Sequence, residues 1–241
     1  MKRWSLFVAV AIVIPFLPVF FSDAQQTNTL PNGARYIGEM KDGKPNGRGE
    51  GIWPKGGQYI GDWKDGKPDG QGTFTHNGWT YVGGVTDGKR EGQGTITGPD
   101  GLKYVGGFKG GAMDGEGTAI WTNGHKYIGE FRGGKQNGQG TLTSPDGTNL
   151  QGEWREGKRY KVSGKEILPD GTIEVGSWNH DGAKSSGSIT WKDGRDYSGD
   201  WKVVDGSAEL PDGSGKMTYP DGKTEEGVWK DGKFMGASTT P

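Results

Sequence analysis

The stretch Tyr104-Val105-Gly106-Gly107-Phe108, followed by a Gly-rich turn and Gly115-Glu116-Gly117, is the unit from which most of this chain is built. The pattern Tyr-x-Gly-x-aromatic, or a variant of it, starts at positions 36, 59, 81, 104, 127, 150, 174, 197 and 225. The steps between these starts are 22 to 24 residues, except for a last step of 28. Self-similarity at a fixed period predicts a tandem repeat array, here of nine units.

The composition excludes several classes of protein. Of 241 residues, 29% are hydrophobic and 49 are Gly, which disfavours one large globular core. A strict Gly-X-Y triplet is absent, so the chain is not collagen-like, and ten Trp, eight Tyr and eight Phe argue against disorder. The aromatic rings are therefore expected to pack within the array.

Charge and cysteine content narrow the functional classes. The chain has 29 Lys and Arg against 30 Asp and Glu, a balance that predicts no global attraction for nucleic acid or an anionic membrane. Without cysteine there is no disulfide framework, thiolate metal site or cysteine nucleophile. The lack of cysteine is compatible with either redox environment.

The first 24 residues differ from the rest. Lys2 and Arg3 precede an uncharged run over residues 4–22, and Ser22-Asp23-Ala24 offers small residues for signal peptidase. We expect a hydrophobic helix that is a cleaved export signal; an uncleaved membrane anchor is the alternative. Both predict that the array is translocated, to a periplasmic or extracellular location. The expected organisation is a signal or anchor over residues 1–24, a linker over 25–33, the array over 34–236 and a tail over 237–241.

Within one unit the residues alternate as a β-strand requires. Tyr59, Gly61 and Trp63 share one face, and the small glycine leaves room for a neighbouring ring. Asp65-Gly66 and Asn77-Gly78 are hairpin turn signals that bracket a second strand. Each unit is therefore predicted to be a β-hairpin, and successive hairpins to form a meander.

Simple magnitudes show that one unit cannot fold alone. Ordering ~23 residues costs roughly 35 kcal/mol, which requires on the order of 1,400 Å² of apolar burial. A hairpin with two or three rings cannot bury that area. The units must stack on one another, which predicts a long and thin molecule.

Two of the units show a family resemblance. Tyr59-Ile-Gly-Asp-Trp-Lys-Asp-Gly-Lys-Pro-Asp-Gly-Gln-Gly and Tyr127-Ile-Gly-Glu-Phe-Arg-Gly-Gly-Lys-Gln-Asn-Gly-Gln-Gly closely resemble the MORN (membrane occupation and recognition nexus) repeat. The resemblance extends over about residues 34–236 and weakens where Leu150, Glu174 and Glu225 replace the tyrosine. It implies an all-β, elongated, solenoid-like array of stacked antiparallel hairpins in a single twisted meander sheet with a groove. It also implies a scaffold, interaction or dimerisation module, or membrane-associated spacer.

Patterns that could carry chemistry have structural explanations. The repeated Gly-x-Gly pairs lack the following helix of a phosphate-binding loop. Most Asp residues stand in Asp-Gly turns, and His76, His125 and His180 occupy different positions in the repeat. We therefore expect no enzyme activity, no cofactor and no metal site.

The sixth unit contains a local basic cluster in an otherwise balanced chain. Its members, candidates for binding an anionic lipid headgroup, a glycan or an acidic partner, are Arg155, Lys158, Arg159, Tyr160, Lys161 and Lys165. Three glutamates lie among these residues, so a solvated turn is the competing interpretation.

Tryptophans recur at related positions, at Trp53, Trp79, Trp121 and Trp191. Rings repeated along a sheet could stack on sugars or hold a hydrophobic peptide; packing in the core is the alternative.

The leading functional hypothesis is a non-enzymatic exported or membrane-tethered scaffold that presents a long β surface to a protein partner or to a second copy of itself. The alternative is an envelope-binding module for anionic lipid headgroups or glycans, which would use the basic sixth unit and exposed aromatics. Neither hypothesis involves nucleic acid.

Overall fold

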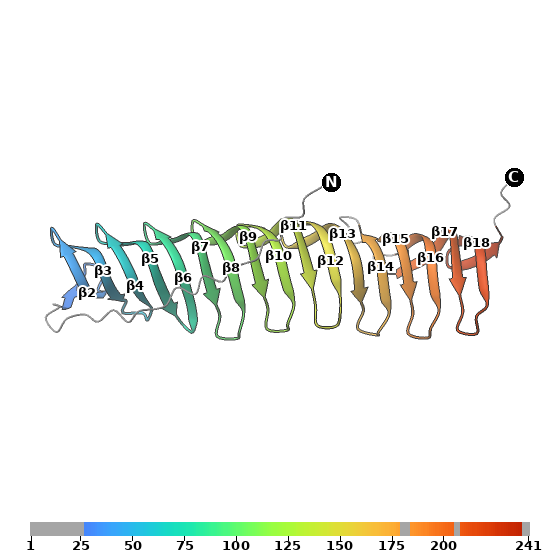
Figure 1. Cartoon of the computed structure of the whole chain (residues 1–241), viewed down its shortest axis with the longest axis horizontal. Helices are drawn as coiled ribbons and strands as arrows, with labels where there is room; N and C mark the ends of the chain where they lie inside the picture. The colour runs from blue at the N-terminus through green and yellow to red at the C-terminus, as the bar shows by residue number, and fades with distance from the viewer. Residues whose placement is uncertain (1–26, 179–183, 205–207, 238–241) are drawn as a thin grey trace, which may run out of the picture.

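The computed structural model describes residues 27–178, 184–204 and 208–237, which form one long, narrow sheet (Figure 1). All regular secondary structure in these ranges is β. Within the same ranges, no helix is long and apolar enough to span a membrane. The hydrophobic helix expected at the N-terminus lies outside the described residues.

The sheet has 19 strands. They are β1 (Thr27–Thr29), β2 (Arg35–Lys41), β3 (Lys44–Ile52), β4 (Gln58–Lys64), β5 (Lys67–His76), β6 (Trp79–Thr86), β7 (Lys89–Thr97), β8 (Lys103–Lys109), β9 (Ala112–Ile120), β10 (Lys126–Arg132), β11 (Lys135–Thr143), β12 (Asn149–Arg155), β13 (Lys158–Ile167), β14 (Ile173–Trp178), β15 (Lys184–Thr190), β16 (Asp196–Val204), β17 (Ala208–Thr218), β18 (Thr224–Lys230) and β19 (Lys233–Gly236).

Every strand pairs antiparallel with the strands before and after it in the chain, from β1 to β19. The nine predicted units are the nine strand pairs from β2/β3 to β18/β19, and β1 adds a strand at the N-terminal end. The predicted meander of stacked hairpins is thus confirmed. In the eighth unit the extra residues lengthen the β16/β17 hairpin, which pairs as far as Val204 and Ala208.

Two kinds of connection alternate along the meander. Most hairpins within a unit close through a two-residue turn such as Asp65-Gly66, whose φ angles of +50° and +89° suit a type I′ turn. Units are joined by longer loops such as Trp121–His125, closed by a 2.9 Å hydrogen bond from Trp121 N to His125 O. The turns therefore lie along one long side of the sheet, uppermost in Figure 1, and the loops along the other. We call these sides the turn rim and the loop rim.

The core is a row of tyrosines lying on glycines. The Tyr104 side chain is fully buried, and its hydroxyl donates a 3.0 Å hydrogen bond to Gly107 O. The ring lies on Gly117 of the neighbouring strand, where an added Cβ would be 2.6 Å from the ring carbon Cζ. The same contact recurs in five other units, where Tyr36, Tyr59, Tyr81, Tyr127 and Tyr197 lie on Gly49, Gly72, Gly94, Gly140 and Gly215. The second glycine of each Gly-x-Gly pair is therefore a seat for a ring, as the predicted alternation of rings and glycines required.

The third repeat position links one unit to the next. Phe131 makes edge-on contacts with Tyr127 of its own unit and Tyr104 of the previous unit, at centroid distances of 5.2 and 5.0 Å. Where Trp occupies this position, the indole also donates to the previous unit, as Trp63 Nε1 does to Gly49 O at 3.1 Å. Each hairpin therefore packs against its neighbour through aromatic rings, and these contacts between units couple the folding of neighbouring repeats.

The sixth unit shows that ring and glycine depend on each other. Leu150 replaces the tyrosine, and the residue opposite Gly152 is Val162, which is buried, where other units have the seat glycine. Without a ring above it, this position accommodates a branched side chain.

Candidate binding groove and surfaces

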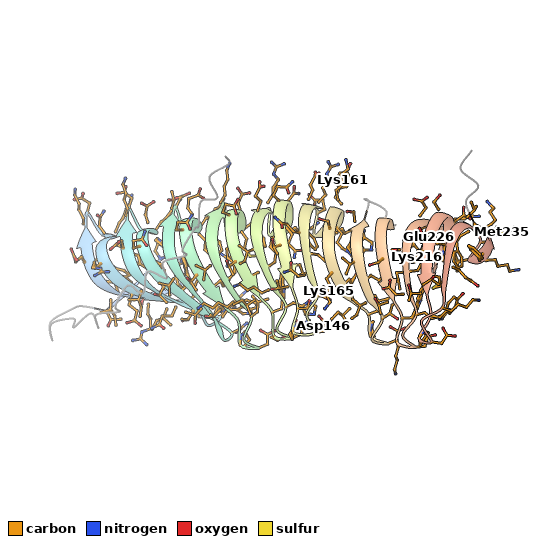
Figure 2. The ribbon with its side chains drawn as sticks, turned by 45° about the vertical axis from the view of Figure 1, so that its right-hand side comes forward. Asp146, Lys161, Lys165, Lys216, Glu226 and Met235 are labelled. Carbon is orange, nitrogen blue, oxygen red and sulfur yellow. The ribbon has the colours of Figure 1, made fainter. Side chains whose placement is uncertain are left out.

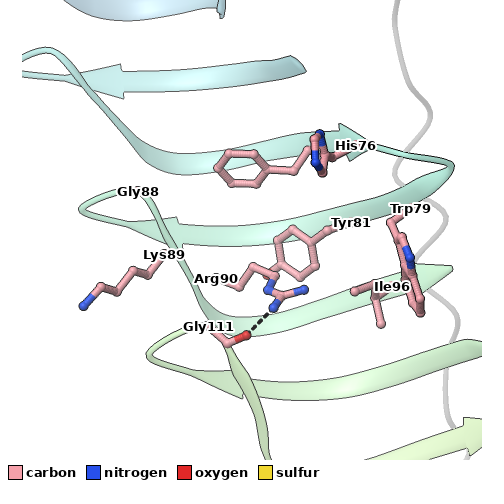
Figure 3. A pocket seen from close by; sticks show the side chains of 9 residues that line it. His76, Trp79, Tyr81, Gly88, Lys89, Arg90, Ile96 and Gly111 are labelled. Carbon is pink, nitrogen blue, oxygen red and sulfur yellow. Dashed lines mark hydrogen bonds between the residues drawn. The ribbon is translucent and has the colours of Figure 1, made fainter. Parts of the chain in front are cut away.

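The ring-bearing face of the sheet is hollowed at the third unit. A hollow of about 320 Å³ lies between the two rims (Figure 3). Its floor and walls are Phe74, Tyr81, Ile96, His76 and Trp79, and its cationic end is formed by Arg90 beside Gly88, Lys89 and Gly111, with the Lys89 side chain extending away from the hollow in Figure 3. The mixture of an apolar floor and a cationic end suits an apolar group that carries a negative charge.

Departures from the repeat explain why the hollow forms here. A two-residue turn at Asn77-Gly78 replaces the longer loop found at the other unit junctions, and brings Trp79 to the start of β6. Gly98 stands at the loop position that Trp53 and Trp121 occupy in other units. A Cβ on Gly98 would lie 3.0 Å from the Trp79 ring, so the glycine makes room for that ring. Trp79 remains 40% exposed beside the hollow.

Arg90 closes the cationic end of the hollow. It occupies the position of Pro45 and Pro68 in the first two units. Its guanidinium lies 5.8 Å from the Tyr81 ring centroid and 5.6 Å from that of Phe108, and it donates to Gly111 O. These contacts fix the charge beside the apolar floor. Burial raises the pKa of Tyr81 to about 12, so its hydroxyl is a neutral hydrogen-bonding group near neutral pH.

A second, more polar hollow of about 560 Å³ lies on the same face at the fifth and sixth units. Arg159 and Glu166 form an ion pair of 2.6 Å in its lining, and Lys158 also contributes. His125 and Ser144 lie 2.8 Å apart through Nδ1 and Oγ, which joins two successive loops. The two hollows are separate on the ring-bearing face, so the groove along the sheet that the sequence resemblance implied stays a prediction.

The structure divides the six residues of the predicted basic cluster. Arg159 and Lys158 line the second hollow. Val162 is buried on the ring face, so Lys161 and Lys165, one and three residues away along β13, lie on the outer face. Figure 2 shows Lys161 near the turn rim and Lys165 nearer the loop rim.

The remaining two members of the cluster contact each other. The Arg155 guanidinium lies 3.3 Å from the Tyr160 ring centroid and pairs with Glu153 at 2.7 Å. Because the six side chains are spread over both faces of the sheet, they do not form one binding patch.

The four predicted tryptophans also occupy different environments. Trp53 and Trp121 pack against the main ring core, and Trp191 packs against the smaller C-terminal core around Tyr197. Trp79 alone of the four is more than a third exposed. Of this set, Trp79 is therefore the ring best placed to meet a ligand.

The carboxylates described by the structure mainly hold the backbone together. Asp62 Oδ2 accepts a 2.8 Å hydrogen bond from Gln71 N across the β-bulge, and Glu130 Oε1 accepts one from Gln139 N. Asp146 and similar loop residues accept from the amide two residues on, and this bond lowers the pKa of Asp146. Among the described residues, no three His, Asp or Glu side chains gather as metal ligands would.

Sequence reasoning missed the first hollow, because Trp79 was the only one of its residues that it proposed for binding. The available signals were the step of 22 residues between the starts of the second and third units and, in the third unit, Arg90 in a proline position. Several departures from the repeat at neighbouring positions indicate a site better than any single residue does.

Comparison with known families identifies the repeat. The profile of the MORN repeat family matches residues 36–58, 59–80, 81–103, 104–126, 127–149, 151–173 and 210–224. A search of curated proteins found no match.

Several solved structures resemble the chain weakly. The G-box domain of the microcephaly protein CPAP is 20% identical over 86% of this chain and 99% of its own, with a TM-score of 0.25. The wild-type TCP10 domain of Danio rerio CPAP is 20% identical over 83% of this chain and 88% of its own, with a TM-score of 0.23. The TCP domain of Drosophila melanogaster SAS-4, solved with a proline-rich motif of Ana2, is 13% identical over 85% of this chain and 90% of its own, with a TM-score of 0.26. TM-scores this low support no conclusion about this chain.

Proposed function

Because this chain belongs to the MORN repeat family, we propose that it is a non-catalytic scaffold whose groove holds an extended segment of a protein partner. The observation that supports this proposal is the hollow of the third unit, where an exposed indole and an apolar floor lie beside the Arg90 guanidinium. Trp and Arg are the residues that most often dominate binding energy at protein interfaces. The expected contact is an apolar side chain next to a carboxylate in the partner.

Self-association through the ends of the sheet is a second possible scaffold function. Among the described residues, β1 and β19 each pair with a single strand, so the two ends of the sheet are where a strand of a second copy would add. Met235 of β19 is 64% exposed at the C-terminal end. A homo-oligomer would cover these ends.

We place the scaffold outside the cytoplasm, either exported or tethered to a membrane. This part of the proposal rests on sequence: Lys2 and Arg3 before an uncharged run, then small residues at Ser22-Asp23-Ala24. Recovery of the tagged chain in a periplasmic or culture fraction, with Edman sequencing of its N-terminus, distinguishes cleavage from anchoring. A full-length cytoplasmic product would refute export.

The alternative function is binding of anionic lipid headgroups or glycans through the sixth unit. Because the cluster is divided between the two faces, this alternative uses only part of it: Lys161 and Lys165 are exposed on the outer face, and Lys158 is exposed beside the second hollow. Changing Lys158, Arg159 and Lys161 to Glu should abolish retention on anionic vesicles or glycan resin. Unchanged retention refutes this alternative.

The scaffold proposal is tested by partner capture with a matched pair of variants. Trp79→Ser removes the exposed ring from the groove, whereas Ile128→Ser removes an apolar side chain, 49% exposed, from the outer face. Quantitative mass spectrometry of crosslinked envelope proteins should recover one or a few partners with the wild type and Ile128→Ser, and about tenfold less with Trp79→Ser. Equal capture by all three refutes the groove as the binding site.

Self-association is measured separately by solution scattering combined with light scattering. A rod of twice the monomer mass supports pairing of copies. A strictly monomeric rod at high concentration excludes it.

A further inference from the structure

The turn rim has an excess of positively charged side chains, although positive and negative residues are balanced over the whole chain. Its seven described turns each consist of two turn residues and one flanking residue on either side, at residues 41–44, 64–67, 86–89, 109–112, 132–135, 155–158 and 230–233. These turns contain twelve Lys or Arg against five Asp or Glu, although the whole chain has 29 against 30. The twelve cations are Lys41, Lys44, Lys64, Lys67, Lys89, Lys109, Arg132, Lys135, Arg155, Lys158, Lys230 and Lys233, and all are exposed.

Like charges also face each other directly in these turns. Lys41 pairs with Lys44 across the first turn and Lys64 with Lys67 across the second, and the same holds for two later turns in units five and six and for the last described turn. Directly opposed like charges in an antiparallel pair are destabilising. An anion bound between them would remove this repulsion.

Ion pairs within the molecule neutralise only part of the row. Four of the twelve cations lie within 4.0 Å of a carboxylate: Lys67, Lys135, Arg155 and Lys230. Of the five turn acids, Asp87, Glu156 and Asp231 pair with lysines, and next to the turns Asp69 accepts from Asp87 N and Glu91 from Gly110 N. The other eight cations have no ion-pair partner among the described residues.

The spacing of the row is regular because the turns are stacked. The second residue of a turn, always a glycine in the described turns, donates to the strand that follows the previous turn, as Gly88 N does to Pro68 O at 2.8 Å. Successive turns are two strands apart, about 9.6 Å, so the six turns of the first six units extend over roughly 48 Å. The row is therefore a line of charge, with up to two cations per step.

We propose that the turn rim binds a linear acidic polysaccharide, whose charges recur along one chain. The four-residue turns contain no apolar side chain larger than Ala112 to insert among lipids, and interfacial membrane binding draws on buried apolar area. In the sixth unit, Tyr160 is covered by Arg155 and Trp154 is buried, so neither ring is offered there for a stacked base. The row overlaps the lining of the first hollow only at Gly88, Lys89 and Gly111, and the rim variant described below changes none of these three residues.

The test measures binding of the full chain to heparin, a linear sulfated polysaccharide, between about 50 and 200 mM NaCl. Neutral dextran, phosphatidylserine vesicles and single-stranded DNA are the comparison ligands. Heparin should bind with an affinity that falls steeply with salt, and dextran should not bind. No binding to heparin, or tighter binding to vesicles or to DNA than to heparin, overturns the proposal.

A matched pair of variants locates the binding surface. The rim variant combines Lys64→Gln, Lys109→Gln, Arg132→Gln and Lys158→Gln. The control variant removes the same charge away from the turn rim, through Arg35→Gln, Lys55→Gln, Lys103→Gln and Lys165→Gln. All eight side chains are exposed, so both variants should fold, which circular dichroism checks. The rim variant should lose about tenfold or more in affinity and bind with a shallower salt dependence. An equal loss in the control variant refutes the turn rim as the site.

Discussion

The contact between Tyr104 and Gly117 gives the sharpest test of how this fold is held together. Gly117→Ala would place a methyl group 2.6 Å from Cζ of Tyr104. Carbon atoms pack best about 3.5–4.0 Å apart, so the ring would have to move by about 1 Å. It cannot move freely, because it lies 5.3 Å from Phe108 and 5.0 Å from Phe131 between ring centroids, and its hydroxyl is bonded to Gly107 O.

The magnitude follows from this confinement. Overpacking a rigid core typically costs about 1–3 kcal/mol, and we expect Gly117→Ala to reduce the free energy of unfolding by about 3 kcal/mol. In a Tyr104→Leu background the ring is absent, as it is naturally at Leu150 above Val162. There the added methyl group should cost less than about 1 kcal/mol, which leaves a coupling energy of about 2 kcal/mol between the two sites.

The assay is urea unfolding followed by circular dichroism and tryptophan fluorescence. Repeat arrays can unfold in parts, so amide hydrogen exchange in β8 and β9 should confirm that the loss is local. The control is Gly110→Asn, because Gly110 has φ +58° and no atom within 4 Å of an added Cβ, and Asn77 already adopts φ +49°. That control should change stability by less than about 0.5 kcal/mol. Equal costs of Gly117→Ala with and without the Tyr104 ring would show that the seat contact does not limit packing.

Three further predictions concern the other contacts of the repeat. Burial raises the pKa of Tyr104 from 10.0 to about 12, so the stability that the neutral, buried tyrosine contributes is complete below pH 10 and is lost as the pH rises towards 12. Absorbance at 295 nm should therefore show the tyrosines ionising together with unfolding. Ionisation near pH 10 with the sheet intact would contradict this prediction. Trp63→Phe keeps a ring but removes the hydrogen bond to Gly49 O, and should lower the free energy of unfolding in urea by about 1 kcal/mol. The control Trp53→Phe loses no such bond and should lower it clearly less. Equal losses of stability would count against a stabilising role for the Trp63 hydrogen bond. Asp62→Ala leaves Gln71 N at the bulge without its acceptor and should lower the free energy of unfolding, measured by thermal unfolding, by about 1.5 kcal/mol. The control Asp65→Asn should be nearly neutral. If Asp62→Ala is also neutral, the Asp62 carboxylate does not stabilise the bulge.

The face of the sheet on which a residue lies could be predicted where the strand is regular, but not where a β-bulge interrupts it. Alternation along a strand placed Tyr59, Gly61 and Trp63 together, and the structure confirms that the tyrosine and tryptophan are buried. The same rule did not foresee that Lys161 and Arg159 would lie on opposite sides of β13, because a bulge in this hairpin shifts the register between β12 and β13.

The overall charge balance could be read from the sequence, but the arrangement of the charges on the surface could not. A balance of 29 cations and 30 anions suggested a surface without electrostatic preference. Stacking of the turns, which depends on hydrogen bonds between units such as Gly88 N to Pro68 O, collects cations on one rim. Composition cannot reveal this asymmetry, because it discards the order in which charges fall on the two kinds of connection.

The sequence by itself determined the nine repeats, the hairpin within each repeat and the pairing of rings with glycines. These features depend on backbone geometry within a few residues. Tertiary structure alone decided that Trp79 stands beside a hollow while Trp53 and Trp121 pack on the core, and that the cations of separate turns form one line. These features arise from distances between units about 23 residues apart in the chain, and such distances are set by the register and stacking of strands.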